Sequence, residues 1–268
     1  MKDHALHLIE GDPNPLHARN ILREYLQARI LGIIQKHGGM IPLAFHGGTA
    51  LRFLYGLPRH SEDLDFSLEK LESGYDPEKL ARVIQWELAP EGYELAVKTN
   101  DRKTVHSIGV VFRRILSEAS LSPDPNETFR ISIEIDTRPP QGAVLETTLI
   151  RRHVLLRIQH HNRPTLLAGK CNAFLTRPYT KGRDVYDLLW HLSDRTCPKP
   201  NLIWLNNALA QFSWQGPAVT DLNWRSVLKD KIETLDFKDV VRDILPFLED
   251  EKEADFLTKE NLIGILCG

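Results

Sequence analysis

Residues 45–66, FHGGTALRFLYGLPRHSEDLDF, decide the fold of this 268-residue chain. A glycine pair at 47–48 precedes a short helical pattern, and a break at 56–58 ends that pattern. Two aspartates, Asp63 and Asp65, follow with one leucine between them. Enzymes that handle phosphate groups need these features together, because backbone N–H groups bind anionic oxygens and paired carboxylates bind a divalent cation.

The glycine pair predicts a site at which an anion can closely approach the backbone. Gly47 and Gly48 have no β-carbon, so a ligand can come near the backbone. The first N–H groups of the helix that follows lack intrahelical partners and favour negative charge. Thr49 adds a hydroxyl that can hold a phosphate oxygen. A glycine pair alone is more often an ordinary strand-to-helix turn, so this interpretation depends on the acids downstream.

Asp63 and Asp65 lie on an expected strand over residues 63–68, where a spacing of two places both carboxylates on one face. Two close carboxylates repel each other, and bound Mg²⁺ or Mn²⁺ offsets that repulsion. A regular alternation over residues 129–137 puts Glu134 and Asp136 on the polar face of another strand. Either residue can supply a third carboxylate, and we favour Glu134. The alternative interpretation for these acids is a solvated strand face.

Hydrophobic periodicity divides the chain into two parts. Helical patterns at 14–38, 49–55 and 76–89 accompany strand patterns at 41–45, 63–68, 93–98, 105–113, 129–137 and 154–159, with a loop expected at 117–127. After residue 164 the pattern is helical, at 165–176, 183–193, 202–212, 224–235, 238–248 and 259–266. We therefore predict an α/β (α+β) fold with a mixed sheet in residues 1–160, followed by a helical subdomain over residues 161–268 that completes the site.

Composition indicates a globular protein. The chain is 42% hydrophobic and 26% charged, which argues against disorder. Its N-terminus lacks the apolar core of a signal peptide and no apolar run is long enough to cross a bilayer, so we expect a cytoplasmic protein with no membrane partner. The three cysteines share no zinc-binding spacing, and neither a disulfide framework nor a zinc site is expected.

The charge distribution is uneven although the formal net charge is only −2. Residues 151–183 contain eight Lys or Arg residues and no Asp or Glu. Such a stretch can attract a polyanion such as a nucleotide or RNA. The alternative is a solvated surface whose charges are balanced elsewhere.

The motif resembles the AbiEii-type nucleotidyltransferase toxins of the DNA polymerase β-like superfamily, which include the MenT toxins of mycobacteria. The resemblance rests on GGTAL at 47–51 and RHSEDLDF at 59–66, which match a Gly-Gly-Thr/Ser turn, an arginine and Ser-x-Asp-x-Asp-Phe. It implies a polymerase β-like nucleotidyltransferase core. It also implies that Gly47, Gly48 and Thr49 hold the triphosphate. Asp63 and Asp65 would bind Mg²⁺ or Mn²⁺.

A downstream pair of segments extends the resemblance. LAGK at 167–170 and KGRDVYDL at 181–188 resemble a helical lysine and an Arg-Asp-x-x-Asp segment of the family. This implies that Lys170 contacts the nucleotide and that Asp184 is a catalytic or lysine-orienting acid. Lys170 lies on an otherwise apolar helix, where an ammonium without a partner is costly. Asp184 could instead cap its helix, and Arg183 could bind a phosphate or pair with an acid.

The resemblance implies metal-dependent transfer of a nucleotide from an NTP to an acceptor hydroxyl. The expected acceptor is the 3′ end of tRNA, and the expected setting is a type IV toxin–antitoxin or phage-defence operon with an AbiEi-type antitoxin. Two alternatives stay open. One is transfer to a small molecule or a protein hydroxyl, and the other is a non-catalytic binding protein on the same scaffold, which the complete set of motif carboxylates disfavours.

Overall fold

A computed structural model describes residues 1–70 and 74–267. The chain forms two compact units. One, named here the sheet unit, comprises Met1–Gly56, His60–Pro139 and Thr147–His160. The other, the helical unit, comprises Leu57–Arg59, Pro140–Glu146 and His161–Gly268.

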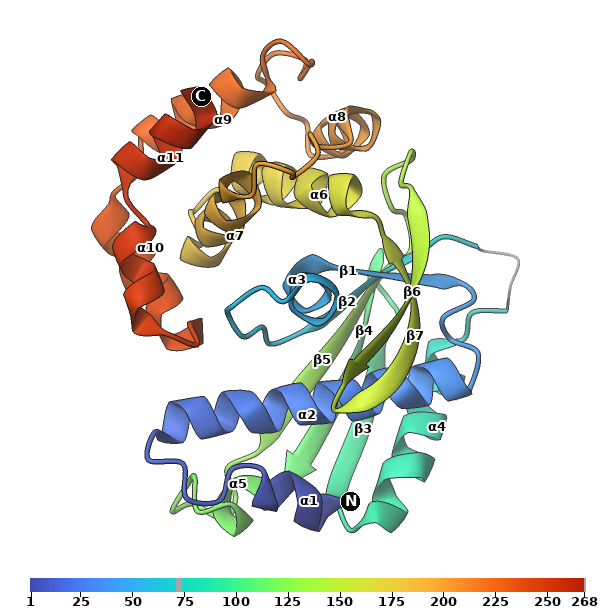
Figure 1. The fold of residues 1–268 in the computed structure, drawn as a ribbon. Helices are drawn as coiled ribbons and strands as arrows, with labels where there is room; N and C mark the ends of the chain where they lie inside the picture. Colours follow the sequence, from blue (N-terminus) through green and yellow to red (C-terminus); the bar gives the residue numbers. More distant parts are fainter. Residues whose placement is uncertain (71–73, 268) are drawn as a thin grey trace. The chain divides into compact units, whose positions relative to one another are not determined.

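A seven-stranded mixed sheet with the order β3-β4-β5-β2-β1-β7-β6 organises the sheet unit (Figure 1). In chain order the strands are β1 (Leu43–His46), β2 (Leu64–Leu68), β3 (Glu94–Asn100), β4 (Val105–Arg113), β5 (Phe129–Asp136), β6 (Leu145–Arg152) and β7 (Val154–His161). Strand β2 runs antiparallel to β1 and parallel to β5. Strand β4 is antiparallel to both β3 and β5. This mixed pairing, together with the helices, confirms the predicted α/β fold class.

Alternation gives the central strands two different faces. In β5, Ile131, Ile133 and Ile135 are fully buried, whereas Glu134 between them is exposed. Helix α2 (Pro15–Lys36) contacts β5, and α4 (Pro77–Leu88) contacts β3 and β4 (Figure 1). The apolar residues form the core of the unit, and the polar positions of β2 and β5 share the opposite face.

The two long helices of the sheet unit begin where their capping signals predict. Asn14 accepts hydrogen bonds from the N–H groups of Leu16 and His17 at the start of α2. Asp76 accepts one from Lys79 at the start of α4. Each cap is followed by a proline, whose fixed φ suits the first helical position.

Helices make up most of the helical unit: α6 (Arg163–Thr176), α7 (Gly182–Ser193), α8 (Leu202–Gln211), α9 (Trp224–Glu233), α10 (Phe237–Ile244) and α11 (Lys259–Cys267), with short 3₁₀ turns at Leu245–Phe247 and Glu251–Phe256. Helix α7 packs against α6 and α10. A β-carbon at Gly182 would overlap the carbonyl oxygen of Val240, so glycine is required for the close contact of α7 with α10. The predicted helical half is confirmed.

Several elements differ from the sequence-based expectations. The structure adds α1 (Lys2–His7) and β6, which were not predicted, and α5 (Ile115–Glu118) enters the expected loop. Strand β6 has no apolar alternation because it lies at the edge of the sheet with several exposed polar residues. The helix expected to reach residue 248 ends at Ile244, because Pro246 cannot continue it. A helix with the length and apolar character to span a bilayer is not found among the described residues.

Candidate active site

The glycine turn directly follows β1 and opens α3 (Gly47–Tyr55). Gly47 has φ +79°, a left-handed conformation that glycine adopts without strain. A β-carbon at Gly47 would lie 2.9 Å from the carboxyl carbon of Asp65 and would overlap one of its oxygens. Glycine at this position therefore makes room for the Asp65 carboxylate, and the two halves of the motif meet in space.

The N-terminus of α3 offers backbone donors. The side chain of the N-cap residue, His46, makes no capping hydrogen bond to its first N–H groups. Thr49 is fully buried, and its hydroxyl donates a hydrogen bond to the backbone carbonyl of Asp63. Because that proton is used inside the protein, the donors that this turn presents to an anion are its N–H groups.

Strand register brings two of the predicted metal ligands side by side. Asp65 of β2 is the register partner of Glu134 in β5, and Asp136 is the partner of Ser67. Neighbouring strands are about 4.8 Å apart, and register partners point to the same face. Asp63 lies one residue before β2, and its place on the face of Asp65 stays a prediction from alternation. We call Asp63, Asp65 and Glu134 the acidic face. Register thus favours Glu134 over Asp136 as the third carboxylate.

Asp136 has a different environment from Glu134. Burial raises the pKa of Asp136, and the nearby charge of Glu69 acts in the same direction. The N–H of Arg138 donates a hydrogen bond to Asp136 Oδ1 at 2.9 Å. Asp136 is therefore engaged with its own turn, whereas Glu134 is exposed beside Asp65.

The donor chemistry of the acidic face fits a hard divalent cation. Carboxylate oxygens are the ligands that Mg²⁺ and Mn²⁺ prefer, and the space at Gly47 accommodates one of the carboxylates. In residues 1–70 and 74–267, no three His, Cys, Asp or Glu side chains are already grouped as a metal site. The metal assignment thus rests on register and ligand chemistry and stays a prediction.

The helical unit contains a buried charge cluster around Lys170. The Nζ of Lys170 lies 2.7 Å from Asp187 Oδ2 and 3.6 Å from Asp184 Oδ1. Arg59 donates two hydrogen bonds to Asp187, from Nε to Oδ1 at 2.6 Å and from Nη2 to Oδ2 at 2.7 Å. Arg177 donates to Asp184 Oδ2 at 2.6 Å. We call these five residues the lysine cluster.

The lysine cluster carries a positive balance, since three cations (Arg59, Lys170 and Arg177) face two carboxylates (Asp184 and Asp187). Burial acts to raise the pKa of Asp187, but the charges of Arg59 and Lys170 outweigh it and lower that pKa to about 2. His191 lies one turn further along α7, and burial lowers its pKa to about 4. At neutral pH His191 is therefore uncharged, and Asp187 is ionised.

Comparison with known proteins identifies the family. A sequence model described as "Nucleotidyl transferase AbiEii toxin, Type IV TA system" matches residues 29–259, most of the chain. The chain belongs to the AbiEii nucleotidyltransferase toxin family. The predicted family and enzyme class are thereby confirmed, and the match assigns no role to any single residue.

Solved structures agree with this fold. A candidate nucleotidyltransferase from Helicobacter pylori is 21% identical, with 90% of this chain and 93% of that chain covered and a TM-score of 0.54. The protein JHP933 from Helicobacter pylori is 22% identical, with coverages of 91% and 92% and a TM-score of 0.52. At these identities the likeness shows a shared fold. A search of curated proteins found no match.

Three residues of the lysine cluster, Arg59, Arg177 and Asp187, were not among the predicted site residues of this AbiEii protein. Arg59 is the arginine of the motif, and Asp187 follows Asp184 by three residues on the same face of α7. The motif position of Arg59 and the spacing of Asp187 from Asp184 were both visible in the sequence. The ion pair that joins them spans 128 positions of the chain, and no local pattern reveals such a contact.

Several cations of the basic stretch at residues 151–183 are paired within the protein. Among the described residues, at least four of the eight have acidic partners: Arg152 with Glu24, Arg163 with Asp194, Lys170 with Asp187, and Arg177 with Asp184. The Arg183 guanidinium lies over the Phe247 ring, 4.2 Å from its centroid. Arg151 and Arg157 are exposed on β6 and β7. The predicted attraction for a polyanion is therefore weaker than the sequence count indicates.

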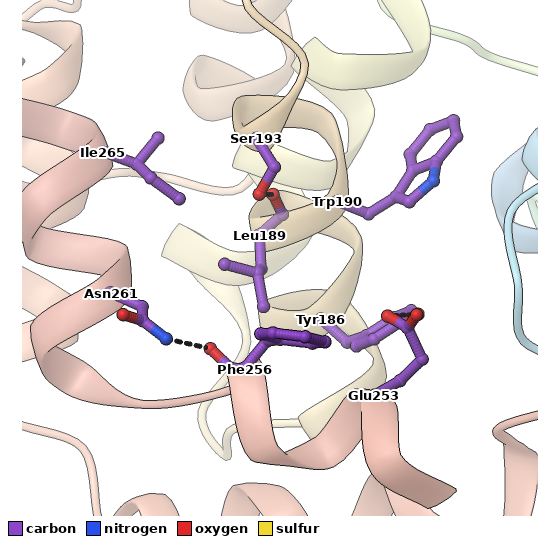
Figure 2. A pocket seen from close by; sticks show the side chains of 8 residues that line it. All are labelled: Tyr186, Leu189, Trp190, Ser193, Glu253, Phe256, Asn261 and Ile265. Atoms are coloured by element: carbon purple, nitrogen blue, oxygen red, sulfur yellow. Dashed lines mark hydrogen bonds between the residues drawn. The ribbon is translucent and has the colours of Figure 1, made fainter. Parts of the chain in front are cut away.

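A pocket of about 430 Å³ lies beside α7 in the helical unit (Figure 2). Its walls are largely apolar, with Leu189 of α7 opposite Ile265 of α11 in Figure 2. Its polar contacts include the hydroxyl of Tyr186, which donates to Glu253 Oε2 at 3.2 Å, and the side-chain amide of Asn261, which donates to the Phe256 carbonyl at 2.9 Å. None of the predicted AbiEii site residues lines this pocket, and it contains no cation that could bind a triphosphate.

Proposed function

We propose that this AbiEii nucleotidyltransferase moves a nucleotide from an NTP to an acceptor hydroxyl in a metal-dependent reaction, with the 3′ end of tRNA as the acceptor. One observation carries the proposal. The register sets Asp65 beside Glu134, and the Asp65 carboxylate lies against the glycine turn. Ligands for a cation and donors for phosphate are thereby adjacent within the sheet unit.

The acidic face and the glycine turn have separate roles in this proposal. Asp63, Asp65 and Glu134 would hold Mg²⁺ or Mn²⁺, which when bound activates the attacking oxygen and stabilises negative charge on the triphosphate. The N–H groups of Gly47, Gly48 and Thr49 would bind phosphate oxygens. The Thr49 hydroxyl supports this turn through its bond to the backbone of Asp63.

The lysine cluster supplies the cationic part of the proposed site. Asp187 is shared between Arg59 and Lys170, so this carboxylate offsets the charge of Lys170 only in part, and the ammonium would keep an attraction for triphosphate oxygens. Asp184 would act on the orientation of Lys170, and Arg183 would contact the nucleotide. We propose that residues 161–268 complete the site.

Our proposal also includes the acceptor molecule and the biological setting of the reaction. The family description names a toxin of a type IV toxin–antitoxin system. We propose a cytoplasmic toxin with an AbiEi-type antitoxin, in an operon that serves phage defence. The exposed Arg151 and Arg157 and the positive balance of the lysine cluster support a polyanionic acceptor such as tRNA.

Radiolabelled NTPs test this proposal directly. The pure full-length protein is incubated with each labelled NTP, Mg²⁺ and bulk tRNA, and we expect label on tRNA with at least one NTP. The matched control is the same tRNA after periodate oxidation, which destroys the 3′-terminal diol. Label on a small molecule or on protein would contradict the RNA acceptor. If no label is transferred and no NTP shifts the thermal unfolding of the protein, the proposed nucleotidyltransferase activity is wrong.

A further inference from the structure

The backbone just before Asp63 is held by side chains rather than by a strand partner. Residues 60–63 lie outside the strands of the sheet unit. The Nε2 of Gln27 donates hydrogen bonds to the carbonyls of Ser61 at 3.0 Å and Glu62 at 2.9 Å. The next carbonyl, that of Asp63, accepts from the Thr49 hydroxyl. Three consecutive carbonyls are thus bound by two side chains, one from α2 and one from α3.

Gln27 is itself held in place. Its side chain is buried, with only 1% of the residue exposed, on the 22-residue helix α2. One turn earlier on α2, Glu24 accepts hydrogen bonds from Arg52 of α3 and from Arg152, the last residue of β6. Helix α2 is therefore tied to α3, the helix that carries Thr49.

The Glu24 carboxylate, which links α2 to α3, stays ionised at neutral pH. Burial acts to raise the pKa of Glu24, but hydrogen bonds from His153 and Arg152 and the charge of Arg52 outweigh it and lower that pKa. Glu24 is thus ionised, and its cations fix α2 next to the glycine turn. Both side chains that bind the carbonyls of residues 61–63 consequently start from rigid elements.

We infer that Gln27 is a positioning residue of the transfer reaction. By fixing the carbonyls of Ser61 and Glu62, it sets the direction in which the chain enters β2 and hence the placement of the Asp63 and Asp65 carboxylates. This inference rests on the proposed function, because it requires a cation at the acidic face. Hydrogen-bonding partners that orient metal ligands change metal affinity by about ten- to hundredfold when they are replaced.

The test compares Gln27→Met with Gln35→Met in the full-length protein. Methionine keeps the length of the side chain and removes both N–H donors. Gln35 lies on the same helix and also bonds a backbone group, the N–H of Arg157, so it is a matched control. Mn²⁺ affinity is measured by electron paramagnetic resonance of the free ion, and the Mg²⁺ dependence of NTP transfer is measured in parallel.

We expect Gln27→Met to weaken Mn²⁺ binding by about ten- to hundredfold and to raise the Mg²⁺ concentration for half-maximal transfer by a similar factor. Gln35→Met should stay within about twofold of the parent, since a surface change has little effect. Gln27→Ala, which leaves space for water at the two carbonyls, serves as the second variant if the methionine variant does not fold.

The measurements distinguish a failure of the positioning role of Gln27 from a failure of the proposed function. A folded Gln27 variant that binds Mn²⁺ as tightly as the parent overturns the positioning role and leaves the proposed function standing. A parent protein that binds no Mn²⁺ and transfers no label overturns the proposed function itself. Thermal unfolding of every variant shows whether a loss of affinity reflects a loss of fold.

Discussion

The acidic face and the lysine cluster hold their charged groups by different means. On the acidic face, backbone register places the carboxylates, and Glu134 is exposed beside Asp65. In the lysine cluster, ion pairs place the side chains, and Arg59 and Asp187 are almost completely buried. We therefore expect that carboxylates placed by strand register can be replaced without loss of the fold, whereas removal of one partner of the buried ion pair destabilises it.

The largest expected effect is loss of transfer in Asp65→Asn. The amide keeps the shape of the side chain but removes one of the charges that would hold the cation. A metal ion contributes several kcal/mol to the reaction, so transfer should fall by about a thousandfold. Label transfer to tRNA measures the rate, and urea unfolding should show little change in stability. A variant that retains a tenth of the activity would contradict the assigned role.

Asp187→Asn should strongly reduce stability. It leaves the buried Arg59 guanidinium without its carboxylate, which costs about 3–5 kcal/mol. Urea unfolding measures the free energy. The matched control is Asp239→Asn on α10, which breaks the exposed pair with Arg242 and should change stability by less than about 1 kcal/mol. Equal losses in the two variants would show that the lysine cluster is not a structural ion-pair network.

The variants Glu134→Gln and Asp136→Asn test which of the two residues supplies the third carboxylate ligand. Because Glu134 is the register partner of Asp65, its replacement should reduce transfer and Mn²⁺ affinity by about a hundredfold, whereas Asp136→Asn should cost less than about tenfold. Both changes are isosteric and lie on the same strand, so each controls for the other. The reverse order of effects would place Asp136, rather than Glu134, at the cation.

The smallest expected effect is a pH dependence of stability that comes from Asp187. Its folded pKa of about 2 lies below the ordinary value of 3.8, so the stabilisation is complete above about pH 4 and is lost as the pH falls toward 2. In urea unfolding, the stability difference between the parent and Asp187→Asn should shrink between pH 5 and pH 3. A constant difference would contradict the depressed pKa.

Much of the fold follows from local rules. Asn14 and Asp76 cap helices where Asn-Pro and Asp-Pro predicted them, and the alternation in β5 buried Ile131, Ile133 and Ile135 as expected. Strand β6 was not predicted, because a strand at the exposed edge of a sheet does not need alternating apolar residues in its sequence. Helix α1 escaped because no strong capping or periodic signal marks six residues.

The candidate site was only partly predictable. The sequence pointed to Gly47, Asp65 and Lys170 through motif and resemblance, and the structure brings Gly47 and Asp65 together. It did not point to Gln27, since a glutamine on an otherwise ordinary helix has no pattern that indicates the carbonyls it will meet. It also overstated the basic stretch, because at least four of those cations have acidic partners outside the stretch.

The amino-acid sequence by itself indicated the family and the starts of α2 and α4, and it predicted a common face for Asp63 and Asp65, because these depend on local periodicity and on residues close together in the chain. Only the tertiary structure decided that Glu134 lies beside Asp65 and that Asp187 joins Arg59 to Lys170. Strand register and buried ion pairs depend on contacts between distant segments. Such contacts exist only when the chain is folded.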